Sequence, residues 1–352
     1  FATRQSLLGM GSDHVTEPHE KFALICGFFY HQATFLDKVG IISEVHLLRV
    51  IMETIPPLKD TRLLIKDVRF ERVKVRIYQP KASSNSLRRG MLYFHGGVGR
   101  LGNSIWPVTG NDCAKTLSLL FRYRLAPEHP YPAQFEDCLT AAIHFLRTAQ
   151  DHGVDPSRVV ICGDSSGGTL TAAVAQALVN RRDLPKLRAQ ILIYPFLQER
   201  TLVLGLKYIN LDLGFIKELF KGCHVSEQQR LKYQKWVSPD HIPHEFKTRG
   251  YKPSPKSPPS EEICEMAKLV FDPVFSPLLA EDSVIAQLPE TFLLTCEFDV
   301  LRDDGLLYKK RLEDHGIKVT WCHLEEGFHG TVFLAVFARL IRFRSGTQGW
   351  KR

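Results

Sequence analysis

Several patterns that mark common protein classes are missing from this sequence. No apolar run approaches the roughly 18–20 residues that a membrane-spanning helix needs, and the longest cover residues 22–30 and 332–338. The 8 cysteines include no C-x-x-C pair and the 14 histidines no H-E-x-x-H pair, which argues against zinc-binding and thiol-redox proteins. We therefore expect no bound metal. We expect Cys138, Cys162 and Cys296 to be small buried side chains.

A dense basic surface is missing as well. The net charge of +8 is spread over 352 residues, with lysines and arginines in every segment. We therefore expect no nucleic-acid partner. The exception is the tail after Leu334, which is basic and contains no acid. Its apolar residues recur at helical spacing, so we expect an amphipathic helix that either packs on the core or lies on an anionic membrane surface.

What the sequence does contain is the pattern of an α/β protein. With 44% hydrophobic and 24% charged residues, it has the composition of a globular chain with a sizeable core. Short apolar strands alternate with helices from residue 63 onwards, which favours a mostly parallel sheet covered on both faces. The predicted strands are 64–68, 73–77, 91–94, 117–123, 159–162, 189–196, 291–298 and 318–324, and the predicted helices lie at 134–153, from 167 and at 306–315.

Two segments do not fit the alternation of strands and helices. Residues 1–62 look helical and irregular, and we assign them to an N-terminal helical cap segment. Residues 63–352 form the second, larger domain. An insertion at about residues 198–275 interrupts this domain and includes a proline-rich connector at 251–259. We expect both segments to cover the sheet as a cap.

The residues Gly163-Asp-Ser-Ser-Gly-Gly168 follow an apolar strand and open a helix. In this context G-x-S-x-G is a nucleophile elbow, a turn so tight that Gly163 and Gly167 must lack side chains. The elbow exposes the Oγ of Ser165 above the sheet. The N–H of Ser166 then lies at a helix N-terminus, where an oxyanion is stabilised. Ser165 is the predicted nucleophile.

A serine nucleophile needs a histidine base, and the base needs an acid that orients it. After a nucleophile elbow, the acid and then the histidine follow at the carboxyl ends of later strands. Asp299 follows the strand 291–298, and His329 follows the strand 318–324 in the segment E-E-G-F-H-G. We therefore predict Asp299 as the acid and His329 as the base.

Three other residues compete for these two roles. Asp303 and Asp304 are alternatives to Asp299, although their position favours capping of the following helix. His323 is the alternative to His329, although it lies inside a strand and is expected to face the core or the surface.

The triplet His95-Gly96-Gly97 follows another strand and offers backbone N–H groups for the second half of an oxyanion hole. The same segment also reads G-x-G-x-x-G from Gly97 to Gly102, as in dinucleotide-binding proteins. That interpretation requires a helix to begin at once and an acid about 20 residues later, and the sequence offers neither. We therefore expect no nucleotide cofactor.

Together with Tyr123-Arg-Leu-Ala-Pro-Glu-His-Pro130, these motifs resemble the hormone-sensitive-lipase group of α/β-hydrolases, and more narrowly the arylacetamide deacetylase-like family. Further segments that fit this family are Trp236–Pro243, Ser276–Ala280 and Cys296–Asp304. The resemblance implies an α/β-hydrolase fold, with a mostly parallel central sheet, helices on both faces and a helical cap.

The resemblance also implies a set of site residues, each at a position that matches a family motif. The nucleophile is Ser165, the acid Asp299 and the base His329; the oxyanion donors are Gly96, Gly97 and Ser166, and the remaining motif residues are His95, Gly163 and Gly167. Such a site needs no cofactor. The family further implies an endoplasmic-reticulum membrane protein with a luminal catalytic domain and an N-terminal anchor that is absent from this chain. Because the chain begins with Phe1 rather than Met, we expect it to be a fragment or a processed form.

Three features depart from the family pattern. Val98 stands where relatives have a third glycine, and a β-branched residue there crowds the loop while keeping its N–H. The stretch from His95 to Tyr123 is several residues short, and the sequence beyond Gly330 lacks the usual final helix. Because loss of one oxyanion donor typically costs about 10²–10³ in turnover, we expect weak activity.

The sequence thus predicts a serine carboxylesterase that acts on apolar acyl esters or amides, with the apolar residues at 215–220 of the insertion shaping the acyl pocket. The alternative, based on the three departures, is a catalytically silent homologue that binds a ligand or a lipid surface. A third possibility is a chain that does not fold. The natural substrate, the acyl length, the disulfide pairing and the oligomeric state are left open.

Overall fold

The computed structural model describes residues 32–53, 60–102, 115–198, 223–247 and 258–332. The chain divides into two compact units, residues 1–56 and 57–352. The smaller unit contains a helix over residues 32–38 and helix α3 (Glu44–Glu53). Between them Gly40 has a φ of 73°, a conformation that suits glycine. The role of this unit as a cap stays a prediction.

The larger unit is built on an eight-stranded sheet with the order β1-β2-β4-β3-β5-β6-β7-β8. β1 with β2 and β2 with β4 pair antiparallel, and every other neighbouring pair is parallel. This sheet and its helices confirm the predicted fold class. The strands are β1 (Leu63–Phe70), β2 (Val73–Pro80), β3 (Arg88–Phe94), β4 (Thr116–Arg122), β5 (Val154–Asp164), β6 (Ala189–Ile193), β7 (Glu290–Phe298) and β8 (Val319–Phe328).

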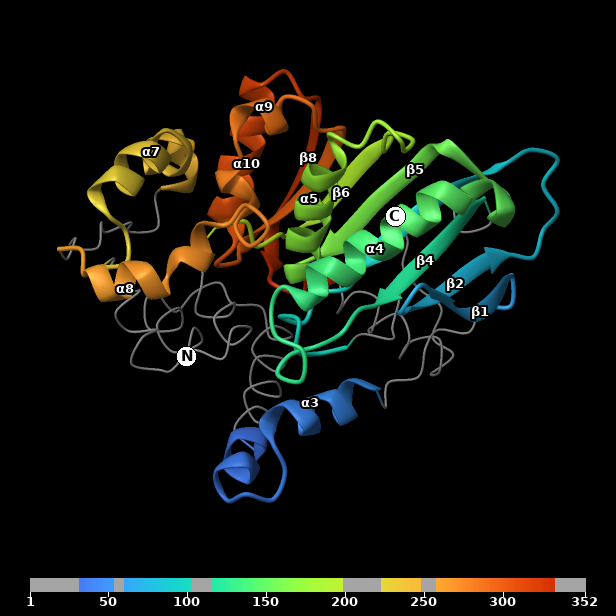
Figure 1. Cartoon of the computed structure of the whole chain (residues 1–352), viewed down its shortest axis with the longest axis horizontal. Coiled ribbons are helices and arrows are strands. Elements are labelled where there is room, and N and C mark those ends of the chain that lie inside the picture. The colour runs from blue at the N-terminus through green and yellow to red at the C-terminus, as the bar shows by residue number, and fades with distance from the viewer. Residues whose placement is uncertain (1–31, 54–59, 103–114, 199–222, 248–257, 333–352) are drawn as a thin grey trace. The chain divides into compact units, whose positions relative to one another are not determined.

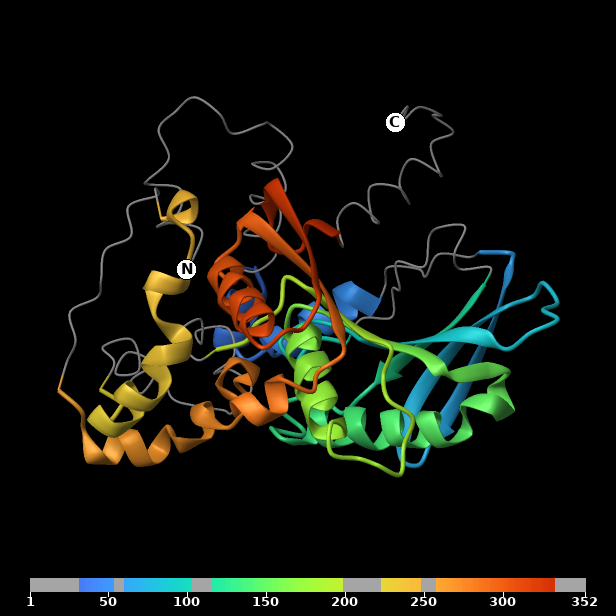
Figure 2. The same ribbon diagram turned by 90° about the horizontal axis from the view of Figure 1, so that it is seen from above.

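Three helices pack on the face of the sheet that is turned toward the viewer in Figure 1, and Figure 2 shows them from above. They are α4 (Ala133–Thr148), α5 (Ser166–Leu178) and α10 (Arg302–Asp314). Alternate strand residues such as Leu92 and Phe94 of β3 belong to the core under these helices. Tyr93 between them points to the opposite face, in a second buried cluster.

The predicted helix over residues 134–153 is confirmed, with a change of geometry near its end. α4 passes into a single 3-10 turn, η2 (Ala149–His152), and Gly153 stops the chain with a φ of 70°. The N–H of Gly153 donates to the carbonyl groups of Ala149 and Gln150. A glycine adopts this left-handed conformation without steric cost, which is why it ends the helix.

The segment between β6 and β7 contains short helices and no strand in its described part. The helices are α7 (Glu227–Val237), α8 (Glu261–Met266) and α9 (Asp282–Ile285), with 3-10 turns η5 (Pro239–His241), η6 (His244–Phe246), η7 (Lys268–Phe271) and η8 (Pro277–Leu279). The predicted pocket residues 215–220, most of the proline-rich connector and the tail 333–352 lie outside the described residues.

The two ends of the insertion are hydrogen-bonded to each other, and its helix α7 contacts α10. The N–H of Leu278 donates to the carbonyl oxygen of Leu197 at 3.0 Å, and both leucines are fully buried. Farther along, the guanidinium of Arg311 on α10 lies 3.9 Å from the centre of the Trp236 ring on α7. The described part of the insertion is thus packed against the sheet and its helices.

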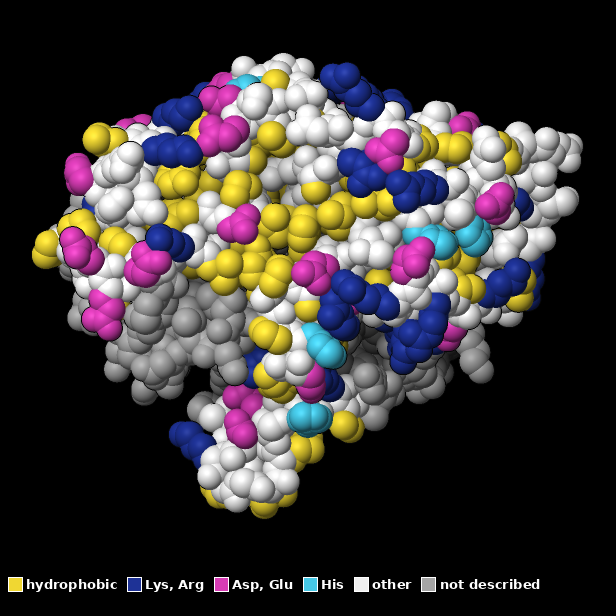
Figure 3. Space-filling model, in the orientation of Figure 1, with side chains coloured by type: hydrophobic (Ala, Val, Ile, Leu, Met, Phe, Trp, Pro, Cys, Tyr) yellow, Lys and Arg dark blue, Asp and Glu magenta, His cyan; other side chains and the backbone are white. Residues whose placement is uncertain are grey.

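The described surface carries charged side chains of both signs. On the face shown in Figure 3, side chains of lysine and arginine lie beside those of aspartate and glutamate, with apolar side chains between them. The predicted buried thiols are confirmed, because Cys138, Cys162 and Cys296 are at most 4% exposed. Burial raises the pKa of Cys296 to about 12, so this thiol stays protonated.

Candidate active site

Ser165 alone links β5 to α5. Its backbone has φ of 54° and ψ of −123°, a conformation that a serine rarely adopts. The glycines on either side make this turn possible. A Cβ on Gly163 would lie 2.2 Å from the carbonyl oxygen of Gly167, and a Cβ on Gly167 would lie 2.1 Å from that of Phe94. Both positions therefore exclude any residue with a side chain.

The register of the last two strands brings Asp299 and His329 together. β7 and β8 pair in parallel, and Phe298 at the end of β7 is the partner of Phe328 at the end of β8. The next residue of each strand is therefore placed at the same edge of the sheet. The Nδ1 of His329 lies 2.9 Å from the Oδ2 of Asp299, and its Nε2 lies 2.9 Å from the Oγ of Ser165.

The surroundings of these groups set the direction of the hydrogen bonds. The Asp299 side chain is 0% exposed, and its Oδ1 accepts the N–H of Leu301 at 2.9 Å. Because a carboxylate only accepts, the Nδ1 of His329 carries the proton. In the neutral imidazole, Nε2 then accepts the hydroxyl proton of Ser165. This arrangement can transfer a proton from the Ser165 hydroxyl to the ring.

The two alternative acids lie elsewhere. Asp304 is buried on α10 and accepts the backbone N–H groups of Leu197 and Gln198 at 2.9 and 3.2 Å. It thus secures the chain after β6, and the N-cap of α10, at Leu301, has no side-chain capping bond. Asp303 forms a surface ion pair with Arg302 at 2.9 Å.

The alternative histidine is also engaged away from Ser165. The Nδ1 of His323 lies 2.9 Å from the Oγ1 of Thr295, and its Nε2 lies 3.2 Å from the carboxylate of Glu297. Both partners belong to β7. The ring of His323 is therefore bound to the neighbouring strand, and among the described residues no hydrogen bond joins it to Ser165 or Asp299.

The loop that follows β3 lies against the elbow. Among the described residues, the N–H groups of Gly97 and Ser166 meet no hydrogen-bond acceptor. Ser166 is the first residue of α5, where a helix leaves its N–H groups unpaired. The N–H of Val98 is different, because it donates to the Oγ of Ser166 at 3.0 Å. Within the described residues, two of the predicted donors thus have no protein acceptor.

The prediction for Gly96 is wrong in this structure. Its N–H donates to the Oδ1 of Asp164 at 2.9 Å, and the hydroxyl of Tyr93 donates to the same oxygen. The physical reason is that a partly buried carboxylate requires hydrogen-bond donors, and the Gly96 amide and the Tyr93 hydroxyl both reach it. An oxyanion therefore cannot use this N–H group while Asp164 holds it.

His95 supports the loop from inside. Its ring is 2% exposed and stacks on Tyr123 with 4.3 Å between the ring centres. The Tyr123 hydroxyl also donates to the backbone carbonyl of His95 at 2.6 Å. Burial lowers the pKa of His95 below its ordinary value of 6.5, so the imidazole is neutral at pH 7 and acts as a packing element.

The nucleotide-binding interpretation of this loop does not fit the structure. Residues 97–101 form a turn rather than a helix, closed by the N–H groups of Arg100 and Leu101 on the carbonyl oxygen of Gly97 at 3.1 and 2.9 Å. A dinucleotide fingerprint requires a helix N-terminus at this point to hold the pyrophosphate.

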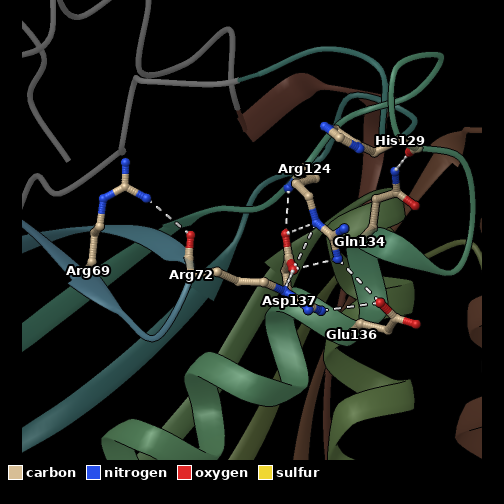
Figure 4. A network of polar contacts seen from close by, with 7 residues as sticks. All are labelled: Arg69, Arg72, Arg124, His129, Gln134, Glu136 and Asp137. Carbon is tan, nitrogen blue, oxygen red and sulfur yellow. Dashed lines mark hydrogen bonds and ion pairs between the residues drawn. The ribbon is translucent and has the colours of Figure 1, made fainter.

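A network of charged side chains surrounds Asp137 on α4 and includes Arg124, which follows β4 (Figure 4). Asp137 on α4 has a side chain that is 3% exposed and accepts both the backbone N–H of Arg124 at 2.9 Å and the guanidinium groups of Arg124 and Arg72. Burial alone would raise the pKa of Asp137, but these bonds hold it below its usual value. Two residues after Arg124, the N–H of Ala126 donates to the carbonyl oxygen of Gly99 at 2.8 Å. The network thus anchors the segment on which the loop rests.

Three contributions to the site escaped the sequence analysis. Asp164 was seen only as a variable position of the elbow, although it binds the loop after β3. The Oγ of Ser166 was not considered, although it accepts the Val98 amide. Tyr194 packs its ring edge against His329 with 5.0 Å between ring centres. Each is a contact between segments far apart in the chain, for which a single sequence has no local signal.

In the described ranges no group of three or more His, Cys, Asp or Glu residues is placed to hold a metal ion. No helix that the structure describes combines the length and hydropathy needed to cross a bilayer.

Comparison with known proteins defines the family. Residues 91–208 and 260–333 match the family described as alpha/beta hydrolase fold. Arylacetamide deacetylase-like 4 of Homo sapiens is 43% identical over 335 residues, which cover 88% of this chain and 82% of the relative. Arylacetamide deacetylase of Mus musculus is 36% identical over 335 residues, which cover 85% and 83%.

Solved structures show the same fold at greater distance. A structure titled arylesterase is 23% identical with a TM-score of 0.56, over 89% of this chain and 96% of the other. A thermostable esterase from Pseudomonas putida ECU1011 is 18% identical with a TM-score of 0.59, over 96% and 95%. The sheet order, the curated relatives and the family match agree, and the chain belongs to the arylacetamide deacetylase family of α/β-hydrolases.

Proposed function

We propose that this protein is a serine carboxylic-ester hydrolase. Ser165 is the nucleophile, His329 the general base and Asp299 the acid that orients the imidazole. The observation that carries the proposal is the continuous series of hydrogen bonds from Asp299 through His329 to Ser165, with 2.9 Å at each link. Membership of a family whose relatives are named deacetylases supports the same class of reaction.

The first half of the reaction transfers the acyl group to the enzyme. The Nε2 of His329 takes the hydroxyl proton of Ser165 while the Oγ attacks the ester carbonyl. The carbonyl oxygen becomes an oxyanion, and the N–H groups of Gly97 and Ser166 donate to it. The protonated imidazole, stabilised by Asp299, then gives its proton to the leaving alcohol or amine as the acyl bond breaks.

The second half restores the enzyme. A water molecule loses a proton to the Nε2 of His329 and attacks the acyl carbon on Ser165 through the same oxyanion arrangement. The bond to the Oγ breaks, the imidazole returns the proton to Ser165, and the carboxylic acid leaves. Every proton in this cycle passes between Ser165, His329, water and the leaving group, so no cofactor takes part.

For the substrate we propose small apolar acyl esters or arylacetamides, on the basis of the names of the relatives. We further propose a location at the endoplasmic-reticulum membrane with the site in the lumen, a lipid or ester ligand and no nucleic-acid partner. To test the luminal location, an N-glycosylation acceptor site is introduced next to the exposed Glu245 in the full gene product. Removal of the attached glycan by a glycosidase shows that the site was glycosylated in the lumen. A full gene product whose introduced site stays unglycosylated contradicts it.

The test of the activity is covalent labelling with a fluorophosphonate probe. We expect the wild type to label and both Ser165→Ala and His329→Ala to lose the label, because the probe requires an activated serine. The matched control is His323→Ala, which removes the alternative histidine and is expected to keep the label. Labelling of His329→Ala at the wild-type rate would contradict the proposed base.

The alternative is a silent homologue that binds a ligand without turnover. The observation that favours it is the Val98 amide, which is bound by Ser166 and so withheld from an oxyanion. A folded wild-type protein with a cooperative melting transition and no labelling would establish this alternative and exclude the esterase.

A further inference from the structure

The loop that follows β3 (residues 95–101), here called the oxyanion loop, contains a residue in an unfavourable backbone conformation. Val98 has a φ of 56°, in the left-handed region that glycine adopts freely and β-branched residues rarely enter. The residue is only half-buried, so core packing alone does not explain the conformation. A specific bond must hold it.

The hydroxyl of Ser166 makes that bond. The Oγ of Ser166 accepts the Val98 N–H at 3.0 Å, across 68 positions of sequence. Ser166 is 8% exposed and begins α5, so its side chain is fixed to a rigid element. The loop is also hydrogen-bonded on either side of Val98. The carbonyl oxygen of Gly97 accepts the N–H groups of Arg100 and Leu101, and the carbonyl oxygen of Gly99 accepts the N–H of Ala126. Within the described part of the chain, only the bond to Ser166 acts on the amide of Val98 itself.

We propose that the Ser166 hydroxyl is a positioning residue that keeps Val98 in the left-handed conformation and thereby directs the N–H of Gly97 toward the reacting carbonyl. This inference rests on the proposed esterase function and deepens it. Ser166 then fixes the two halves of the oxyanion hole to each other, with its own N–H on one side and, through Val98, the Gly97 N–H on the other. The hydrogen bond to the Ser166 hydroxyl thus holds Val98 in a conformation that a glycine would adopt without such a bond. We call this bond the hydroxyl tether.

The geometry makes a specific prediction about the dependence of one residue on the other. The hydroxyl is needed only because residue 98 is a valine. Without it, valine relaxes toward negative φ and the neighbouring peptide at Gly97 rotates. With glycine at this position the loop keeps its shape unaided. The effect of removing the hydroxyl should therefore vanish when Val98 is changed to glycine.

The experiment is a double-mutant cycle with Ser166→Ala, Val98→Gly and the double variant, assayed on a p-nitrophenyl ester. We expect Ser166→Ala to lower kcat by about tenfold in the wild-type background, less than the 10²–10³ of a lost oxyanion donor, with KM nearly unchanged. In the Val98→Gly background the same change should alter kcat by less than about twofold, because the tether is then dispensable. An equal loss in both backgrounds would overturn the proposal, since the hydroxyl would then contact the oxyanion directly.

A second measurement does not depend on activity. Amide hydrogen exchange of the segment 96–99 should be faster in Ser166→Ala than in the wild type, because the Val98 N–H loses its acceptor. Unchanged exchange, or unchanged kcat in an active protein, would refute the tether. If the wild type neither labels with fluorophosphonate nor hydrolyses the ester, the proposed function fails, and the exchange comparison still decides whether Ser166 holds Val98.

Discussion

The carboxylate of Asp299 and the imidazole of His329 are 2.9 Å apart, yet the carboxylate is 0% and the imidazole 33% exposed. The carboxylate is thus shielded from water, while the imidazole is partly open to solvent. The Oδ2 of Asp299 faces Nδ1 of the imidazole, and Nε2 is left to face the Oγ of Ser165. The division of burial between the two residues therefore suits an orienting acid and an accessible base.

Replacement of Asp299 by asparagine should abolish most activity without unfolding the protein. The amide oxygen still accepts the N–H of Leu301, but it presents the wrong group to His329 and favours the wrong tautomer, which costs about 10⁴ in kcat in such sites. The matched control is Asp303→Asn, which changes a surface ion pair and should leave kcat within about twofold. Steady-state ester hydrolysis measures both. If Asp303→Asn were the inactive variant, the assignment of the acid would be wrong.

A methyl group on Gly167 should prevent normal folding. The Cβ would lie 2.1 Å from the carbonyl oxygen of Phe94, so β3 and α5 would have to separate, at a cost of about 3 kcal/mol or more. In the control Gly102→Ala, the nearest atom to the new Cβ is the Cδ1 of Leu125 at 3.6 Å, an ordinary contact. We expect the control to melt within a few degrees of the wild type in a thermal scan. A Gly167→Ala protein of wild-type Tm would show that the elbow has another geometry.

Two adjacent acids on α4 should differ in their effect on stability. Asp137→Ala removes a side chain that is 3% exposed and leaves Arg124 and Arg72 without their shared partner. We expect a loss of about 2–3 kcal/mol in the free energy of unfolding, below that of a fully buried pair because both arginines reach solvent. Glu136→Ala removes a side chain that is 50% exposed and should cost less than about 1 kcal/mol. Urea unfolding of both variants checks the order, and equal losses would contradict the account of the network.

Acid should destabilise the protein through His95. The pKa of His95 is below 6.5 in the folded protein. When the pH falls below about 6.5, His95 therefore becomes protonated in the unfolded chain but stays neutral in the folded chain. The free energy of unfolding then decreases from about pH 6.5 toward the folded pKa, by at most about 1.4 kcal/mol per pH unit for this group. His95→Gln should flatten the pH dependence. A part of the slope should remain, because burial also lowers the pKa of His152. An unchanged slope in the variant would assign the effect to other groups.

The sequence carried the information for those features that depend on local pattern. The strand that leads to Ser165, the helix stop at Gly153 and the order of Asp299 and His329 all follow from turn chemistry and strand ends, and the structure has them at these positions.

What could not be read from the sequence depends on contacts between distant segments. Gly96 was expected to offer its N–H to an oxyanion, but Asp164 takes it. Asp304 was expected to cap a helix, but it binds the chain after β6 instead. In both cases a carboxylate near the sheet finds backbone donors that lie 68 and 107 residues away. Such pairings depend on how the strands are ordered in space, which hydrophobic periodicity does not encode.

The hydrogen bond between Leu197 and Leu278 has a consequence for how this protein can change. It fixes the chain that leaves β6 to the chain that returns toward β7. The strands that lead to Ser165, Asp299 and His329 pair through β6 and with each other, and the described part of the insertion packs against them, for example where Phe246 meets Trp321 of β8. A foreign segment spliced between the two leucines would therefore have to replace the ring contacts that Phe246 and Trp236 make with Trp321 and Arg311. The same hydrogen bond that marks where the insertion begins and ends thus also marks how much of its packing a replacement must reproduce.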